Sequence, residues 1–213
     1  MQIEIIEQQA LVPDKGIIAE VIERHPISKE LCIHVKTIFI EKAEKESIEY
    51  DVYSKKVILN LTQNSHEKEN FKYILFHEFS HVANKARSDF NYSGEVKNSL
   101  TDLEKSLVME LWNVYIDSRL NYYGFFMLGP DDANVYGTVD GKLQKLPFTI
   151  EGKLLGHTAF LASRGFQDAK FVVEDIWNNP QRMTSYSNLI RIVKERLPNN
   201  TLKRDAAKDC RAP

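Results

Sequence analysis

Residues 77–81 read HEFSH, which is an HExxH sequence. On a helix, positions i and i+4 share one face, so the imidazoles of His77 and His81 can reach the same metal ion. Glu78, next to the first histidine, is placed to polarise a water molecule at that ion. Because a chance match occurs on the order of once in a hundred chains of this composition, the surrounding sequence decides how the motif is interpreted.

The residues around the motif predict a partly buried helix. On a helical wheel of residues 71–82, Glu78 falls inside the apolar stripe, and His77 and His81 lie together at its edge. The stripe consists of Phe71, Ile74, Leu75 and Val82. Since an unpaired buried carboxylate is costly, a metal site explains Glu78 better than a purely structural helix does. The alternative is that Glu78 pairs with a distant Lys or Arg and that both histidines are core residues.

Catalytic zinc requires three protein ligands and one open position, so a third ligand is expected outside the motif. Residues 106–121 read SLVMELWNVYIDSRLN, which predicts a helix that is apolar on nearly every side and therefore buried. Its narrow polar stripe consists of Glu110, Asn113, Asp117 and Asn121. We favour Asp117 as the third ligand, because the amides one turn away on either side could brace it or a ligating histidine. Glu110 remains the competitor.

HEFSH followed by an acid-bearing helix resembles the zincin metallopeptidases, particularly those of gluzincin type. The segment LWNVYIDSRLN is also similar to a WNxxxDxxxN stretch that follows HExxH in some uncharacterised bacterial and archaeal metallopeptidases. The resemblance covers roughly residues 30–125. It implies a zincin-like fold with one Zn²⁺ per chain, in which His77 and His81 are metal ligands. It further implies that Glu78 is the general base and acid, and that the third ligand is Asp117 or Glu110.

The resemblance has limits. The residues after His81 read VANKARSD, so the HxxGxxH extension of the metzincins is absent, and so is the NExxSD form of thermolysin-like enzymes. The implied mechanism is hydrolysis by a metal-activated water, which also needs a donor to stabilise the oxyanion. The sequence does not rank the candidates for this donor, which are Tyr92, Tyr122, Tyr123, Tyr136 and His157. For His157 itself, a core or helix-surface position is the favoured interpretation.

Three functions are compatible with these residues. The first is a zinc-dependent peptidase that acts on polypeptides. The second is a regulatory zincin that binds or cleaves one specific protein partner, as stress-response and mobile-element zincins do. The third is a metal-free helical domain that carries a chance motif. The sequence identifies neither the substrate and its cleavage preference nor the role of residues 125–213.

The elements that position the motif predict an α+β fold with a small sheet in the first third of the chain. Apolar spacing predicts a helix over residues 14–25, a strand over 32–40 and a hairpin over 50–61 that turns near Ser54. The motif helix is expected to run from a cap at Asn64 to about Arg87. Further helices are expected over 101–123, 151–163, 167–178 and 184–196, with residues 124–147 forming a loop.

We expect residues 1–125 to form the catalytic core, 126–197 a helical extension or subdomain, and 198–213 a flexible tail. The chain has 213 residues, with 28 basic and 30 acidic side chains, so its charge gives no reason to expect nucleic acid or an anionic membrane as a partner. Neither a signal sequence nor a stretch of about 20 apolar residues is present. A cytoplasmic protein is therefore expected, while its oligomeric state stays open.

Overall fold

The computed structural model describes residues 3–7, 15–44, 47–62, 71–124, 149–183 and 185–197, together with the backbone of 134–139 and 142–147. The fold is α+β, with a small sheet and a larger share of helix, as predicted. The expected cap at Asn64 and the expected tail over 198–213 lie outside the described residues.

A four-stranded mixed sheet occupies the first third of the chain, with the strand order β1-β2-β4-β3. The strands are β1 (Glu4–Glu7), β2 (Thr37–Lys42), β3 (Ser47–Asp51) and β4 (Lys56–Leu61). β1 and β4 both pair with β2 in parallel, whereas β3 forms an antiparallel hairpin with β4. Ile38, Ile40, Val57 and Leu59 point to the same face and are almost completely buried, which is the two-residue period of a one-sided sheet.

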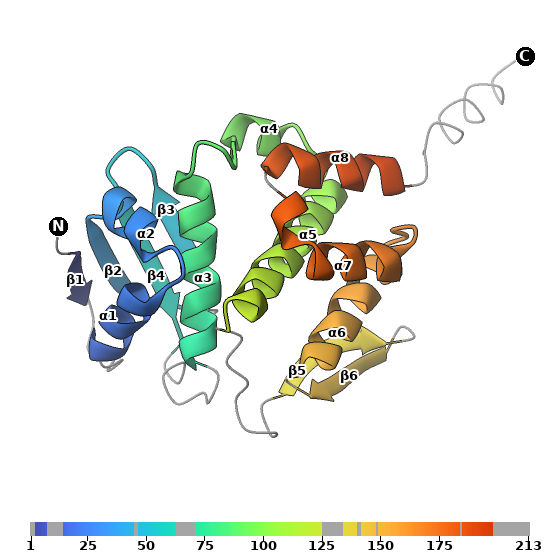
Figure 1. Ribbon diagram of the computed structural model, residues 1–213, viewed down its shortest axis with the longest axis horizontal. Helices are drawn as coiled ribbons and strands as arrows, with labels where there is room; N and C mark the ends of the chain where they lie inside the picture. The colour runs from blue at the N-terminus through green and yellow to red at the C-terminus, as the bar shows by residue number, and fades with distance from the viewer. Residues whose placement is uncertain are drawn as a thin grey trace, which may run out of the picture.

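Three helices pack together beside this sheet (Figure 1): α1 (Lys15–Arg24), α2 (Ser28–His34) and α3 (Phe71–Ala86). α3 carries the HEFSH motif and contacts α1, α2, β3 and the later helix α5. The motif helix therefore lies between the sheet layer and the rest of the molecule.

The helix α5 (Asp102–Tyr122) follows the short helix α4 (Gly94–Asn98), and its buried residues lie between Leu107 and Leu120. A capping box begins it: the Thr101 hydroxyl accepts from the backbone N–H of Glu104, and the Glu104 carboxylate accepts from the backbone N–H of Thr101. Gly124 follows it with φ of 71°, a left-handed conformation that glycine adopts without strain.

The remaining helices pack against α5 on the side away from the four-stranded sheet, and a two-stranded hairpin packs against the first of them (Figure 1). They are the hairpin β5 (Asn134–Val139) and β6 (Lys142–Pro147), and the helices α6 (Ile150–Ser163), α7 (Ala169–Asn178) and α8 (Tyr186–Arg196). A 3₁₀ turn, η2 (Pro180–Arg182), joins the last two helices. The buried apolar side chains of both halves form a single core cluster.

Two sequence expectations are wrong. Residues 32–34 form the last turn of helix α2 and do not start a strand. This helix buries Leu31, whereas the side chain of Ile33 is 56% exposed. The apolar residues over 32–40 suggested one buried strand, but Ile33 in this run faces solvent, so its apolar character did not indicate burial. In addition, residues 134–147 hold a two-stranded sheet where a loop was expected, so strands are not confined to the first third.

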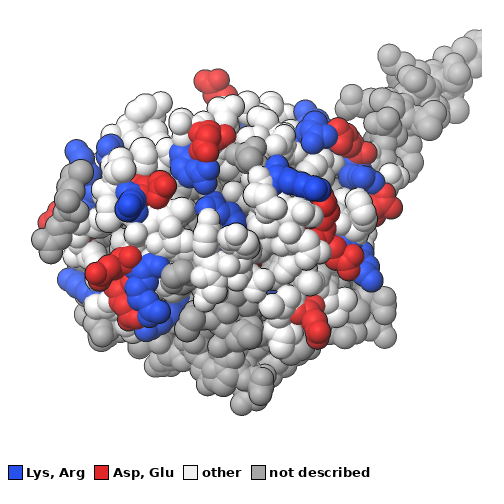
Figure 2. All heavy atoms as spheres, in the orientation of Figure 1, with Lys and Arg blue, Asp and Glu red and all other residues white. Residues whose placement is uncertain are grey.

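Among the described helices, none combines the length and the apolar character that a membrane span requires. On the face shown in Figure 2, basic and acidic side chains are interspersed rather than gathered by sign. This distribution agrees with the near balance of 28 basic and 30 acidic residues.

Candidate metal centre

The two histidines of HEFSH lie one helical turn apart on α3 and share a face, as their spacing predicted. Their ring centroids are 5.1 Å apart with an interplanar angle of 67°. The side chain of His77 is 14% exposed, and His81 is buried. Both rings contact residues of α5, which brings the motif against the acid-bearing helix.

Asp117 of α5 is completely buried and contacts the first histidine directly. The Nδ1 of His77 lies 2.6 Å from Asp117 Oδ1, and the Tyr73 hydroxyl donates to the same oxygen. A carboxylate that accepts from one ring nitrogen fixes the orientation of the imidazole and leaves the other nitrogen to serve as a ligand. Asp117 therefore orients His77 in this arrangement, which is a different task from binding the metal itself.

His81 is held by an amide and an aromatic ring, both from α5. Its Nε2 lies 3.1 Å from Asn113 Oδ1, and its ring packs edge-on against Trp112 at a centroid distance of 4.7 Å. Burial, together with the nearby His77 and Lys85, holds the pKa of His81 well below its usual range. The ring is therefore neutral at neutral pH, and a metal ligand must be neutral. The expectation that an amide of α5 braces a motif histidine is met by Asn113.

Two further side chains of the cluster come from α6: Lys153, which the sequence did not single out, and His157, one of the five candidate oxyanion donors. Lys153 Nζ lies 3.2 Å from Asp117 Oδ2. His157 bridges two carboxylates, with Nε2 at 3.3 Å from Asp117 Oδ2 and Nδ1 at 2.8 Å from Glu110 Oε1. His157 is buried, as favoured from the sequence, but its partners are the two candidate third ligands. The only signal in the sequence was the spacing of Lys153 and His157, which puts them on one face of a helix.

The carboxylates of this cluster, Asp117 and Glu110, are paired with basic side chains of the same chain. Burial alone would raise the pKa of the Asp117 carboxyl, but Lys153, His77 and His157 hold it well below its usual range. Burial alone would lower the pKa of His157, but its hydrogen bonds to Asp117 and Glu110 raise it. Both ring nitrogens face carboxylates, which accept hydrogen bonds, so these surroundings favour the doubly protonated ring. Burial and Asp117 raise the pKa of Tyr73 well above its usual value, so its hydroxyl stays protonated.

Glu78 is half-buried rather than fully buried as expected. Burial lowers the pKa of Lys85, and the charge of Glu78 offsets part of that lowering; the same charge adds to the burial that raises the pKa of Tyr73. The carboxylate is thus on the rim of the cluster, within electrostatic range of a tyrosine that contacts Asp117. This position is compatible with a base that exchanges protons with solvent.

The tyrosine that contacts the cluster is Tyr73, one turn before His77 and not among the oxyanion donors proposed from the sequence. Tyr92 packs in an aromatic group with Trp112 and Tyr186. Tyr122 and Tyr123 are 74% and 48% exposed at the end of α5. The side chain of Tyr136 lies outside the described residues. Of the three tyrosines whose side chains are described, none forms a ring contact or a hydrogen bond with His77 or His81.

The donor types of this cluster fit zinc, which takes imidazole and carboxylate ligands. Their present arrangement does not complete a site: among the described residues, no three His, Cys, Asp or Glu side chains are grouped so that they could hold one ion. His77 and Asp117 face each other instead, and the second oxygen of Asp117 faces α6. The choice between Asp117 and Glu110 as third ligand stays a prediction, because both are engaged by His157.

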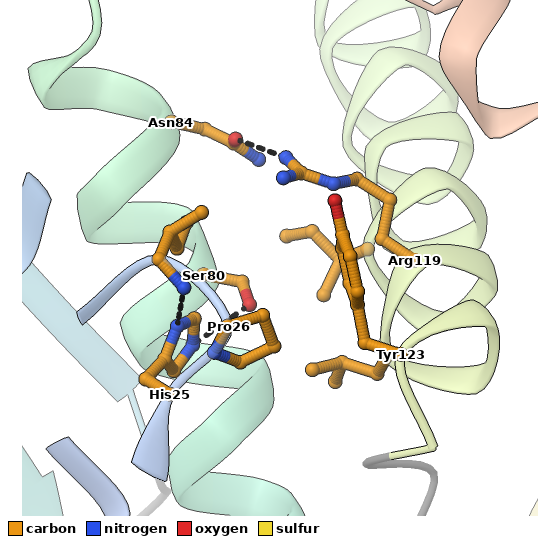
Figure 3. Close-up of a pocket in the computed structure, with 9 residues that line it drawn as sticks. His25, Pro26, Ser80, Asn84, Arg119 and Tyr123 are labelled. Atoms are coloured by element: carbon orange, nitrogen blue, oxygen red, sulfur yellow. Dashed lines mark hydrogen bonds between the residues drawn. The ribbon is translucent and has the colours of Figure 1, made fainter. Parts of the chain in front are cut away.

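A separate small cavity lies further along the interface of α3 and α5 (Figure 3). Its volume is about 10 Å³, which is room for the centre of one water molecule, so it is too small for a peptide. Arg119 donates to Asn84 Oδ1 across it at 3.4 Å, and His25 lies near Ser80 on its other side. Neither motif histidine lines this cavity. We therefore place the candidate site at the histidine cluster.

Comparisons of this chain with protein-family models, with curated proteins and with solved structures find no significant match. The assignment of a function therefore rests on the residues and contacts described above.

Proposed function

We propose that this chain is a zinc-dependent peptidase with a zincin-like active site. The observation that carries the proposal is the contact between the HExxH helix and the acidic stripe of α5, in which His77 Nδ1 lies 2.6 Å from the buried Asp117. A helix that merely contained the motif by chance would have no need of a buried carboxylate against its first histidine.

In the proposed site, His77 and His81 would hold the zinc ion together with Asp117 or Glu110. A bound zinc ion supplies acidification of water and polarisation of a carbonyl group. Glu78 accepts the proton of the attacking water and delivers it to the leaving amine. Asn113 orients the His81 imidazole through one ring nitrogen, and Asp117 orients His77 in the same way if Glu110 is the third ligand. Tyr73 keeps its proton and remains a donor beside the cluster.

The experiment that tests this proposal separates metal binding from hydrolysis. Purified parent protein is expected to contain about one zinc per chain by elemental analysis, as three-ligand sites do, and His77→Ala or His81→Ala should lose it. His34→Ala is the matched control, because His34 lies on α2 outside the cluster. Glu78→Gln should retain the zinc and lose cleavage of a peptide library.

Each outcome assigns the cluster a different role. If the parent and Glu78→Gln both bind zinc and their digests are identical, the peptidase proposal fails, and a regulatory role that binds one protein partner is favoured. If the parent holds no zinc under zinc-replete conditions, the cluster is a structural network of a metal-free domain. Separate Asp117→Ala and Glu110→Ala variants identify the third ligand by the loss of zinc affinity.

A further inference from the structure

Arg119, in the last turn of α5, is half-buried and has no acidic partner within the described part of the chain. Its guanidinium donates to two neutral oxygens, Asn84 Oδ1 at 3.4 Å and the Tyr115 hydroxyl at 3.2 Å. It also lies over two aromatic rings, 5.4 Å from the ring centroid of Tyr115 and 5.9 Å from that of Tyr123. In addition to burial, its charge lowers the pKa of the nearby His25. These contacts orient the guanidinium without neutralising it.

The amide that holds Arg119 leaves a buried donor without an acceptor. Asn84 has no exposure to solvent, and its Nδ2 has no hydrogen-bond partner among the described residues. Turning the amide over would not correct this, because Nδ2 would then face the N–H donors of Arg119. Since an unpaired buried N–H group is rare and costly, this position fits an acceptor atom of a bound molecule.

Arg119 also lines a groove of about 500 Å³ between the ends of α3 and α5 and the 3₁₀ turn η2. This volume lies within the range of about 300–1,000 Å³ that is usual for small-molecule sites. Tyr122 and Tyr123 line the groove as well, with 74% and 48% exposure and with their rings edge-on at a centroid distance of 5.2 Å. The groove therefore offers aromatic surface beside a positive charge.

The charges of the groove favour a singly charged anion. Its second arginine, Arg87, is paired with Asp89 through two nitrogens, and no Asp or Glu is among the described residues that line the groove. Arg119 is left as one uncompensated positive charge, and its planar fork matches the two oxygens of a carboxylate. A phosphate dianion would bring a second negative charge that this groove does not balance.

The small cavity of Figure 3 supplies a place for one of the carboxylate oxygens. Arg119 and Tyr123 line both this cavity and the groove, and Asn84 lies on the cavity's α3 side (Figure 3). The cavity has room for the centre of one water molecule and hence for one oxygen atom of similar size. A carboxylate held by Arg119 can thus provide the acceptor that Asn84 Nδ2 lacks.

We propose that this groove is a second ligand site, which binds an aromatic carboxylate. The acid group is held by Arg119 and the Asn84 amide, and the ring packs against Tyr122 and Tyr123 in offset or edge-on contact. The same chemical group is present in small aromatic acids and at the C-terminus of a peptide that ends in an aromatic residue. The site is independent of the proposed zinc centre, because neither motif histidine lines the groove.

NMR chemical-shift titration of the full chain tests the ligand chemistry. Phenylacetate should bind at least about tenfold more tightly than phenylethanol, which lacks the charge, because a hydrogen bond to a charged group contributes at least that factor. Acetate, which lacks the ring, should also bind more weakly. Equal affinities for phenylacetate and phenylethanol overturn the proposal, and tighter binding of benzyl phosphate overturns the assignment to a carboxylate. Tighter binding of acetyl-glycyl-phenylalanine than of phenylacetate supports a peptide C-terminus as the source, and the reverse order supports a free aromatic acid.

Substitutions test the residues. Arg119→Gln removes the charge, and Asn84→Asp supplies an internal carboxylate to Arg119 without a change of size, so both should weaken phenylacetate binding at least about tenfold. Tyr122→Ala, at an exposed position, should weaken the binding of phenylacetate but not that of acetate. Arg164→Gln is the matched control, because Arg164 lies over the ring of Phe160 but does not line the groove.

Thermal unfolding followed by circular dichroism shows which variants are folded. If Arg119→Gln does not fold, Asn84→Asp and Tyr122→Ala still decide the result, because one keeps the size of a buried side chain and the other changes an exposed one. Folded Asn84→Asp and Tyr122→Ala proteins that bind phenylacetate as tightly as the parent overturn the proposal.

Discussion

Asp117 is a buried carboxylate whose charge is balanced by side chains from two other helices. An ion of this kind is tolerated in a protein interior only if it is paired and hydrogen-bonded. Tyr73 and His77 come from α3, and Lys153 and His157 come from α6. The residue thus joins the motif helix to the C-terminal half and gives α6 a chemical as well as a packing role.

His25 is another buried histidine, and its pKa is shifted in the opposite direction to the pKa of His157. Burial lowers the pKa of His25 to about 4, and its ring is held by Nε2–H donation to the Phe76 carbonyl at 3.1 Å. In the unfolded chain its pKa is about 6.5. The unfolded chain therefore binds the proton more readily, and protonation disfavours folding.

This pKa difference makes a prediction about acid stability. The contribution of His25 is fully present above about pH 6.5, declines as the pH falls towards 4, and amounts to about 3 kcal/mol over that range. His25→Gln, which can still donate to Phe76, should lower stability at pH 7.5 yet show a shallower loss on acidification. Urea unfolding of both proteins at several pH values measures this. Parallel pH profiles for the parent and His25→Gln would contradict it, and His34→Gln serves as the control.

At the scale of the elements, α5 decides whether the cluster forms, because Glu110, Asn113 and Asp117 all lie on it. Its register relative to α3 is maintained by burial of apolar side chains on both sides of the polar stripe, among them Leu111, Trp112 and Ile116. The start of the helix is defined by the capping box at Thr101 and Glu104. The end of the helix is set by Gly124.

The cap makes a prediction about this element. Thr101→Ala removes the acceptor for the backbone N–H of Glu104 and should destabilise the protein by about 1 kcal/mol, the usual contribution of an N-cap. Thr101→Ser keeps the hydroxyl and should stay close to the parent. Chemical denaturation measures the difference. A Thr101→Ala protein as stable as the Thr101→Ser protein would show that the cap contributes nothing here.

The long helices were predictable because their signals are local. The periodicity of apolar residues located α1, α5, α6, α7 and α8 to within a few residues, and the turn near Ser54 was placed correctly in the β3–β4 hairpin. The short helix α2 was missed because the apolar residues at its end resemble a strand. The hairpin of β5 and β6 was missed because its glycines suggested a loop.

At the scale of the whole molecule, the two halves of the chain share one core. Aromatic rings connect them: Tyr186 of α8 lies 5.6 Å from Trp112 and 5.0 Å from Tyr92, measured between ring centroids. The backbone N–H of Tyr186 also donates to the Phe90 carbonyl at 2.7 Å. The C-terminal helices therefore cover apolar surface of α5 that would otherwise face water.

This shared core predicts the outcome of truncation. A chain that ends at Gly124 would expose the sides of α5 that contact α6, α7 and α8, and it would leave Asp117 without Lys153 and His157. It should lose cooperative unfolding, measured by circular dichroism during heating, and bind a hydrophobic dye. A chain that ends at Leu197 retains every described helix and should unfold like the parent. Cooperative unfolding of the shorter fragment would refute a shared core.

The sequence by itself determined which residues could carry chemistry. His77 and His81 share a face because they are one turn apart, and the polar stripe of α5 follows from helical periodicity; both are local properties of the chain. The tertiary structure determined which side chains these residues contact. It placed Asp117 against His77, 40 residues away, and it brought Lys153 and His157 of α6 to the same carboxylate. Contacts of this kind depend on how helices pack, and packing is set by the whole core rather than by any one segment.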